Sequence, residues 1–262
     1  MRLSCCAYSY RQALQSGQIT LFDFLRVCRD LEMDGVELTA YYFPTTARDF
    51  LESVRQEAQS LGLTVSGTAV GSDFAQPDAG KRREHVAMTQ AWIEHSVTLG
   101  APTLRVFAGG VREGQREEEA FGNVVACLQE CAGLAAERGV KLALENHGGL
   151  TATAEGTLRL LKAVDRPAVG LNLDFGNFTG DIYAQFAACA PYAVATHAKK
   201  SAHGPTGPIP VDYRRVGKIM EEAGYQGFLA IEYEEEAPAE TGVPAFASEL
   251  RAIFPRDEKR KS

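Results

Sequence analysis

Short apolar runs alternate along the chain with longer segments in which apolar residues recur at helical spacing. Each short run ends in polar or glycine residues, and a new helical pattern then begins. Runs of this length with turn residues on both sides are typical of buried strands. We expect about eight strands, over residues 3–9, 35–38, 63–70, 103–110, 140–149, 168–177, 193–200 and 227–234.

The longer segments predict amphipathic helices. In one of them Val124 and Leu128 lie one helical turn apart, three glutamates stand near the start, and Gly139 follows the last apolar position. An apolar stripe, an acidic first turn and a glycine at the end are all features of helices in globular proteins. We expect such helices over residues 45–62, 81–100 and 117–139.

Strands that alternate with helices predict parallel strands joined by helical crossovers. The sheet is then either open and doubly wound or closed into a barrel. About eight strand–helix units within 262 residues favour the barrel. We expect a single α/β domain over residues 1–254 and a loose C-terminal tail, PRDEKRKS, over residues 255–262.

Composition narrows the class of protein. A hydrophobic fraction of 45% and a charged fraction of 23% are ordinary for a globular domain. The net charge of -7 argues against nucleic acid as a partner. The six cysteines form no CxxC pair and are expected to be small buried side chains. We see neither a signal peptide nor a membrane-spanning run, so we expect a reduced cytoplasmic protein without a membrane partner.

Four predicted strands each end on a side chain that can bind metal. The apolar runs lead to Glu145, Asp174, His197 and Glu232. In a parallel barrel these ends meet at one rim, where catalytic groups are found. Any one of the four could be satisfied by a neighbouring group, but three acids at one rim would repel each other without a cation. Such ligands suit one divalent ion, Mn²⁺ or Mg²⁺ ahead of Co²⁺ or a structural Zn²⁺.

Nearly the whole chain resembles the xylose isomerase-like TIM barrels, the sugar phosphate isomerase/epimerase group. The similar segments are GVEL (35–38), AWIEHSVTLGAPTLRVFAGG (91–110), LALENHGG (142–149), GLNLDFGN (170–177), HAKK (197–200) and AIEYE (230–234). The resemblance implies a single (β/α)8 TIM barrel with one divalent ion bound by Glu145, Asp174, His197 and Glu232. It also implies that Glu145 and Glu232 flank the substrate, one removing a proton beside a carbonyl and the other returning it to the enediolate.

Further residues are candidates for contact with the substrate. Lys199 matches the HxK pattern of the family and would polarise a substrate oxygen, or it is a surface lysine. His147 could bind substrate or orient a ligand. His203 lies in a Gly/Pro-rich loop after the seventh strand and could be only a loop histidine. Asn177 stands where several epimerases of the group carry a histidine, and an amide cannot move a proton near neutral pH.

Two candidates would act from inside the barrel. Arg105 points inward if its strand alternates, and an unpaired interior arginine is costly, so we expect it to pair with Glu145 or a nearby acid, with substrate contact as the alternative. Glu37 ends the second strand and is expected to accept a hydrogen bond from a metal ligand.

Four functions remain open. The first is an isomerase or epimerase of a sugar or keto-polyol, and the second is a lyase or dehydratase of a keto-sugar or keto-inositol. Both begin with removal of the same proton. The third is a DNA-repair endonuclease, which the acidic balance disfavours, and the fourth is a sugar-binding barrel without catalysis. The Gly pairs at 109–110 and 148–149 make no P-loop, so the substrate need not be phosphorylated. A homo-oligomer is compatible with the sequence.

Overall fold

Eight parallel strands close into a barrel in this computed structural model, which describes residues 1–204 and 206–256. Around the barrel the order is β1, β10, β7, β6, β5, β4, β3 and β2, and β2 then pairs with β1. The strands are β1 (Arg2–Cys6), β2 (Gly35–Thr39), β3 (Thr64–Ala69), β4 (Thr103–Val106), β5 (Lys141–Glu145), β6 (Val169–Asp174), β7 (Ala193–Ala198) and β10 (Phe228–Ile231). Each overlaps a predicted strand, and the predicted single (β/α)8 TIM barrel is confirmed.

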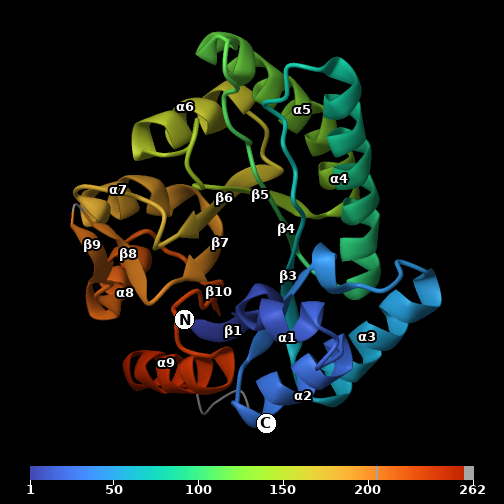
Figure 1. Ribbon diagram of the computed structural model, residues 1–262, viewed down its shortest axis with the longest axis vertical. Coiled ribbons are helices and arrows are strands. Elements are labelled where there is room, and N and C mark those ends of the chain that lie inside the picture. The colour runs from blue at the N-terminus through green and yellow to red at the C-terminus, as the bar shows by residue number, and fades with distance from the viewer. Residues whose placement is uncertain (205, 257–262) are drawn as a thin grey trace.

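Helices surround the barrel on the outside (Figure 1). They are α1 (Arg11–Gln15), α2 (Leu21–Asp30), α3 (Arg48–Ser60), α4 (Ala79–Leu99), α5 (Glu117–Arg138), α6 (Ala154–Val164), α7 (Ile182–Cys189), α8 (Tyr213–Glu222) and α9 (Ala239–Ile253), with short 3-10 helices at Ala7–Tyr10, Ala40–Tyr42 and Ala190–Tyr192. The three helices predicted from the sequence correspond to α3, α4 and α5. No helix in the described part of the chain is long and apolar enough to cross a membrane.

The ends of several helices are set by local sequence. The Asp78 carboxylate caps α4 by accepting a hydrogen bond of 2.8 Å from the backbone N–H of Lys81. Gly100 and Gly139, with φ of 75° and 69°, end α4 and α5 in the left-handed conformation that glycine adopts without strain. The chain is therefore turned sharply into β4 and β5, the strands that carry Arg105 and Glu145.

Residues 201–204 and 207–210 differ from the loop expected from the sequence. They form an antiparallel hairpin, β8 (Ser201–Gly204) and β9 (Gly207–Pro210), in which Ser201 lies opposite Pro210. The hairpin stands outside the barrel as a separate two-stranded sheet, where a proline removes no essential ladder bond. The hairpin could not be predicted from composition, because glycine and proline usually indicate an irregular loop.

The C-terminal tail is described only in part. Arg256 donates a hydrogen bond of 3.1 Å from Nε to the Asp34 carboxylate and another of 3.1 Å to the Met33 carbonyl. The remainder of the predicted tail, residues 257–262, lies outside the described residues.

All six cysteines are buried and none forms a disulfide, as expected from the sequence.

Two irregularities in strand register lie beside inward-facing polar residues. The pairing of β2 with β3 shifts between Val36 and Glu37, and the pairing of β6 with β7 shifts between Leu171 and Asn172. A shift of this kind re-aims the side chains that follow it, and such features are common next to active sites. Glu37 and Asn172 are both buried and both contact residues of the site described below.

A pair of glycine substitutions tests the packing of the barrel. A Cβ at Gly35 would lie 2.5 Å from the Thr64 carbonyl oxygen and 2.8 Å from the Phe228 ring, so we expect Gly35→Ala to destabilise the protein by about 1–3 kcal/mol through overcrowding. Gly133 is exposed inside α5 with nothing near its Cβ position, so Gly133→Ala should stabilise by about 0.5–1 kcal/mol. Urea unfolding of both variants measures the two changes, and equal effects would contradict this account of the packing.

Candidate active site

Four side chains at the C-terminal ends of neighbouring strands converge inside the barrel. Glu145 and Asp174 are the last residues of β5 and β6, His197 lies near the end of β7, and Glu232 follows directly after β10. One ligand atom from each lies within 4.8 Å of the others, and all four residues are buried. These are the four residues predicted from the strand ends, and the structure brings them together as expected.

The buried polar atoms of this group fit a cation. His197 Nδ1 lies 3.3 Å from a Glu232 oxygen, 3.4 Å from a Glu145 oxygen and 3.7 Å from Asp174 Oδ2. Both His197 Nδ1 and Asp174 Oδ2 are buried without a hydrogen-bond partner. Buried polar atoms in proteins are nearly always satisfied, so atoms left without a partner need an explanation. A divalent ion with oxygen and imidazole ligands would satisfy both.

One ion pair and two amide donors hold the Glu145 carboxylate. Arg105 Nε lies 3.2 Å from Oε2, as the sequence predicted, and Asn172 Nδ2 donates to the same oxygen at 3.0 Å. Asn177 Nδ2 lies 3.4 Å from Oε1. Burial is the largest influence on Glu145 and raises its pKa to about 7, although Arg105 and His197 act in the opposite direction. This carboxyl group is therefore held in place and is close to its titration midpoint at neutral pH.

Glu232 has a different environment. Lys199 Nζ lies 2.8 Å from Glu232 Oε2 and 3.6 Å from Asp174 Oδ2, and it also pairs with Glu234. Burial would raise the pKa of Glu232, but His197 and Lys199 outweigh it and hold the pKa well below the usual value. Lys199 is only 8% exposed, so the alternative of a surface lysine is wrong.

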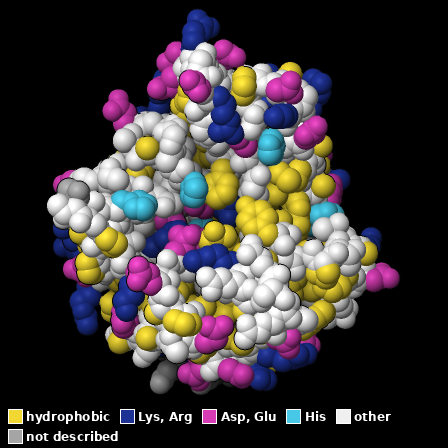
Figure 2. All heavy atoms as spheres, in the orientation of Figure 1, with side chains coloured by type: hydrophobic (Ala, Val, Ile, Leu, Met, Phe, Trp, Pro, Cys, Tyr) yellow, Lys and Arg dark blue, Asp and Glu magenta, His cyan; other side chains and the backbone are white. Residues whose placement is uncertain are grey.

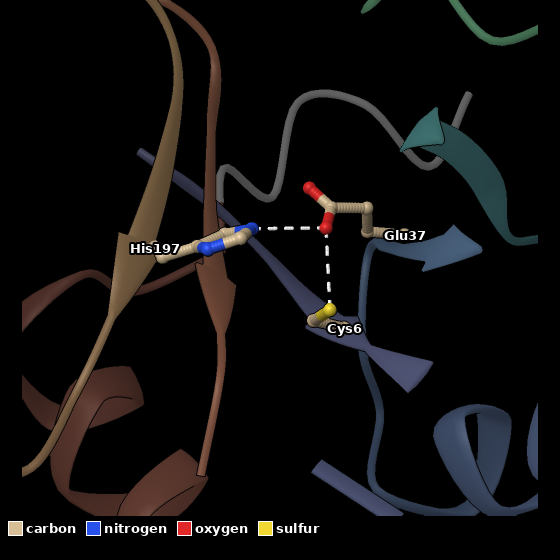
Figure 3. A group of neighbouring side chains, drawn as sticks. All are labelled: Cys6, Glu37 and His197. Atoms are coloured by element: carbon tan, nitrogen blue, oxygen red, sulfur yellow. Dashed lines mark hydrogen bonds and ion pairs between the residues drawn. The ribbon is translucent and has the colours of Figure 1, made fainter. Parts of the chain in front are cut away.

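Glu37 contacts His197 from the side opposite the four-residue group. Glu37 Oε1 lies 2.9 Å from His197 Nε2, and the same oxygen accepts a hydrogen bond of 3.2 Å from the Cys6 thiol (Figure 3). The carboxylates of Glu232, Glu37 and Glu145 raise the pKa of His197 well above its usual value, against the lowering that burial alone would cause. The hydrogen bond of Glu37 to a metal-binding candidate is thus the arrangement expected from the sequence.

Neither remaining histidine candidate forms a hydrogen bond or ion pair with the four-residue group in the described part of the chain. The His147 ring packs against the Phe107 ring with centroids 4.4 Å apart, and burial lowers its pKa. His203 is exposed in β8, and its backbone N–H donates to the Gly176 carbonyl at 3.2 Å. The space-filling view shows a hollow in the middle of one face, where acidic, basic, histidine and hydrophobic side chains meet (Figure 2).

Sequence reasoning missed three residues that support the site. Asn146 clamps the end of β6, because its side chain donates to the Asp174 carbonyl at 2.9 Å and accepts from the Asp174 N–H at 2.8 Å. Asn172 and Cys6 contact Glu145 and Glu37. Asn172 had a detectable signal, because it precedes Asp174 by two positions and so lies on the same face of the strand. Asn146 and Cys6 carry no comparable pattern.

Two relatives by sequence have different activities in their names. The chain is 25% identical over 186 residues to a 3-dehydroshikimate dehydratase of Bacillus anthracis, a match that covers 67% of this chain and 62% of that protein. It is 25% identical over 182 residues to a Mus musculus protein that carries the name of a hydroxypyruvate isomerase, covering 63% of this chain and 64% of that protein. The chain thus matches less than two thirds of the length of either relative.

Solved structures of similar fold cover almost the whole chain. The IOLI protein with a bound zinc atom superposes with a TM-score of 0.78 at 18% identity, over 97% of each chain. D-psicose 3-epimerase with D-tagatose from Clostridium cellulolyticum H10 superposes with a TM-score of 0.77 at 18% identity, over 99% of this chain and 93% of that one.

The sequence profile of the xylose isomerase-like TIM barrels matches residues 25–253, which is most of the chain. The closed barrel and its strand order agree with that match. The resemblance inferred from the strand-end motifs is thereby confirmed, and the chain belongs to the xylose isomerase-like TIM barrel family.

Proposed function

We propose that this protein is a divalent-metal-dependent enzyme that removes a proton beside the carbonyl of a sugar or keto-polyol and returns it, as an isomerase or epimerase. The observation that carries the proposal is the convergence of Glu145 and Glu232, from β5 and β10, with Asp174 and His197 in one buried group. Acid–base catalysis requires carboxyl groups within hydrogen-bond distance of the proton that is transferred. Two carboxyl groups this close together would both meet that requirement for a substrate carbon bound between them.

Glu145, Asp174, His197 and Glu232 would hold the ion, which when bound supplies polarisation of the substrate carbonyl. The charges of the described interior support this assignment. Four buried carboxylates, Glu37 and the three acidic ligands, face only Arg105 and Lys199 as permanent cations. One divalent ion would cancel the deficit. The zinc in the structure of the similar IOLI protein supports a metal of this charge.

The two glutamates would share the proton transfers because their surroundings differ. Burial brings the pKa of Glu145 to about 7, whereas His197 and Lys199 hold Glu232 as a carboxylate. Titratable pairs whose environments separate their pKa values are typical of acid–base catalysis. We assign proton removal to one of these glutamates and proton return to the other.

The other candidates would bind and orient the substrate. Lys199 is a buried cation beside Glu232 and is placed to contact a substrate oxygen. Asn177 reaches Glu145 with its amide and would bond a hydroxyl group without moving a proton. Arg105 would keep Glu145 in position rather than contact substrate, since its guanidinium is buried between Glu145 and the Phe107 ring. His147 and His203 would contact parts of the substrate farther from the reacting carbon.

A lyase reaction is the second candidate, favoured by the sequence similarity to a 3-dehydroshikimate dehydratase. It starts with the same proton removal. The electron pair left on the carbon then forms a double bond while the β-hydroxyl group departs and takes up a proton as water. The two reactions therefore differ only in the fate of the deprotonated intermediate.

Incubation with a panel of ketoses and keto-polyols in D₂O, with added Mn²⁺, separates the two candidates. An isomerase or epimerase gives products of unchanged composition that gain deuterium at the reacting carbon. A lyase gives products lighter by one water. Proton NMR and mass spectrometry measure both. Absence of exchange and of turnover across the panel would contradict the proposed function.

Replacing either glutamate by glutamine should remove turnover. We expect Glu232→Gln and Glu145→Gln each to lower kcat by about 10²–10⁴-fold, because the amide cannot accept or deliver the proton. Glu236→Gln, on an exposed residue of the same loop as Glu232, is the matched control and should leave kcat unchanged. Metal content must be measured alongside, since both glutamates are also proposed ligands. A variant that keeps its metal and its full rate would rule out that residue as a catalytic group.

Metal binding should release protons near neutral pH. The pKa of Glu145 is raised to about 7 and that of His197 lies well above its usual value, so both groups retain protons that a metal must displace. The affinity for Mn²⁺ should therefore rise as the pH increases from about 6 to about 8. Titration calorimetry in two buffers of different ionisation enthalpy counts the protons. His203→Ala, on the exposed hairpin, should leave the count unchanged, and binding without proton release would contradict the prediction.

A further inference from the structure

The Cys6 thiol and the Glu37 carboxylate form a hydrogen-bonded pair directly behind His197. Cys6 and Glu37 lie opposite each other in the register of β1 and β2, so their side chains share one layer of the barrel interior. His197 reaches the same layer from β7, on the other side of β10. Figure 3 shows one Glu37 oxygen turned toward both neighbours and the other turned away.

We propose that Cys6 and Glu37 are positioning residues that fix the tautomer of His197, so that Nε2 carries the hydrogen and Nδ1 presents its lone pair to the metal site. The inference rests on the proposed metal site and adds to it the means by which the imidazole is oriented. Metal-binding histidines commonly donate their other ring N–H to a carboxylate, and that partner fixes the ring.

The chemistry of the two partners determines the direction of the hydrogen bond between Glu37 and His197. Glu37 Oε1 can only accept from His197 Nε2 at 2.9 Å, which places a hydrogen on Nε2. The opposite ring nitrogen, Nδ1, faces Glu145, Asp174 and Glu232 at 3.3–3.7 Å. A neutral imidazole has one donor and one acceptor nitrogen, so this orientation leaves Nδ1 as the ligand atom.

Cys6 would restrain the carboxylate itself. Its thiol lies 3.2 Å from Glu37 Oε1, against 3.6 Å from the Thr39 hydroxyl and 3.8 Å from Glu232 Oε1. The thiol therefore stands between a metal-site glutamate and Glu37, and its shortest contact is to Glu37. With a second donor on Oε1, rotation of the carboxylate away from His197 costs two hydrogen bonds instead of one.

A cavity on the far side of Glu37 helps to explain how the buried carboxylate is tolerated. The cavity has a volume of about 110 Å³ and a mostly apolar wall, to which Glu37, Arg2 and Thr103 contribute polar groups. A cavity of this size has room for water beside its polar groups, and water satisfies groups that a dry interior would leave unpaired. Glu37 can thus be hydrated on one side and bonded to Cys6 and His197 on the other.

The alternative is that Cys6, Glu37 and His197 form a second metal site with a thiolate ligand. One atom from each of Cys6, Glu37 and His197 lies within 4.8 Å of the others. In that arrangement Nε2 would bind metal and could not donate to Glu37. The stoichiometry of metal binding distinguishes the two, since the second site predicts two ions per chain and the positioning pair predicts one.

The test measures zinc affinity and stoichiometry of the full chain by competition with a chelator of known affinity. We expect Glu37→Gln to bind Zn²⁺ about 10–100-fold more weakly, because a neutral amide accepts the Nε2 hydrogen more weakly than a carboxylate and can also turn its NH2 toward Nε2, which places the hydrogen on Nδ1. Cys6→Ala should lose about two- to tenfold, the worth of one hydrogen bond from a weak thiol donor. Cys6→Ser keeps a donor and should stay within about twofold of wild type.

Cys5→Ala is the matched control. Cys5 is equally buried on the same strand but packs in the hydrophobic core, so its loss should lower the melting temperature without changing zinc affinity. Nitrogen-15 NMR of labelled histidine in the zinc-loaded protein should show His197 protonated at Nε2 and metal-bound at Nδ1. A merely structural role would alter melting temperatures but would not reproduce the rescue by serine.

Each outcome bears on the inference. Wild-type protein that binds one zinc ion while Glu37→Gln and Cys6→Ala bind equally well would overturn the positioning role and leave the proposed function standing. Two zinc ions in wild type and one in Cys6→Ala would establish the second metal site instead. Wild-type protein that binds no divalent ion would overturn both this inference and the proposed function.

Discussion

The repulsion among buried carboxylates is the constraint on which the centre of this molecule depends. Glu145, Asp174 and Glu232 place ligand oxygens within 4.8 Å of one another, and Glu37 adds a fourth acid one layer deeper. Like charges at this separation strongly disfavour common ionisation unless cations stand among them. The barrel supplies Arg105, Lys199 and the imidazole of His197. Among the described residues these cations do not balance the charge of the four carboxylates. A divalent ion would supply the missing positive charge.

The closed barrel lowers the conformational entropy that is lost when these charged side chains are brought together. Each acid is carried by a different strand or strand end, and each strand is fixed by parallel pairing on both sides. The side chains therefore lose little further freedom when they converge. Local hydrogen bonds and register shifts then set the orientation of individual side chains. Asn146 clamps the backbone of Asp174, and register shifts precede Glu37 and Asn172. The site is thus held by backbone geometry first and by side-chain hydrogen bonds second.

Much of this arrangement could be predicted because it follows from position along a strand. An apolar run that ends in an acid or a histidine identifies a rim residue, and that rule places Glu145, Asp174, His197 and Glu232 without coordinates. The pairing of Arg105 with Glu145 follows from the cost of an unpaired interior arginine. Contacts between strands distant in sequence cannot be predicted in this way. The sequence around Cys6 indicates only a buried thiol, and its contact with Glu37 follows from the register of β1 and β2.

Lys199 and the β8–β9 hairpin show where sequence reasoning stops for physical reasons. Whether a lysine two positions after His197 is buried depends on where Glu232 and Glu234 lie, and both follow another strand, β10. The hairpin is built from residues whose propensities favour irregular structure, so cross-strand pairing decides its form. Both features are tertiary outcomes that override local preference.

The asymmetry between the two glutamates bears most directly on the reaction. Glu145 is held by an ion pair with Arg105 and a hydrogen bond from Asn172, whereas Glu232 is paired with the buried ammonium of Lys199. Two carboxyl groups whose pKa values are separated in this way would pass a proton between them and a substrate carbon. Elimination needs in addition a proton for the departing hydroxyl group, and the Asn177 amide, which lies beside Glu145, cannot supply it. That proton would have to come from one of the two glutamates or from the substrate, so the same pair of carboxyl groups would serve either fate of the deprotonated intermediate.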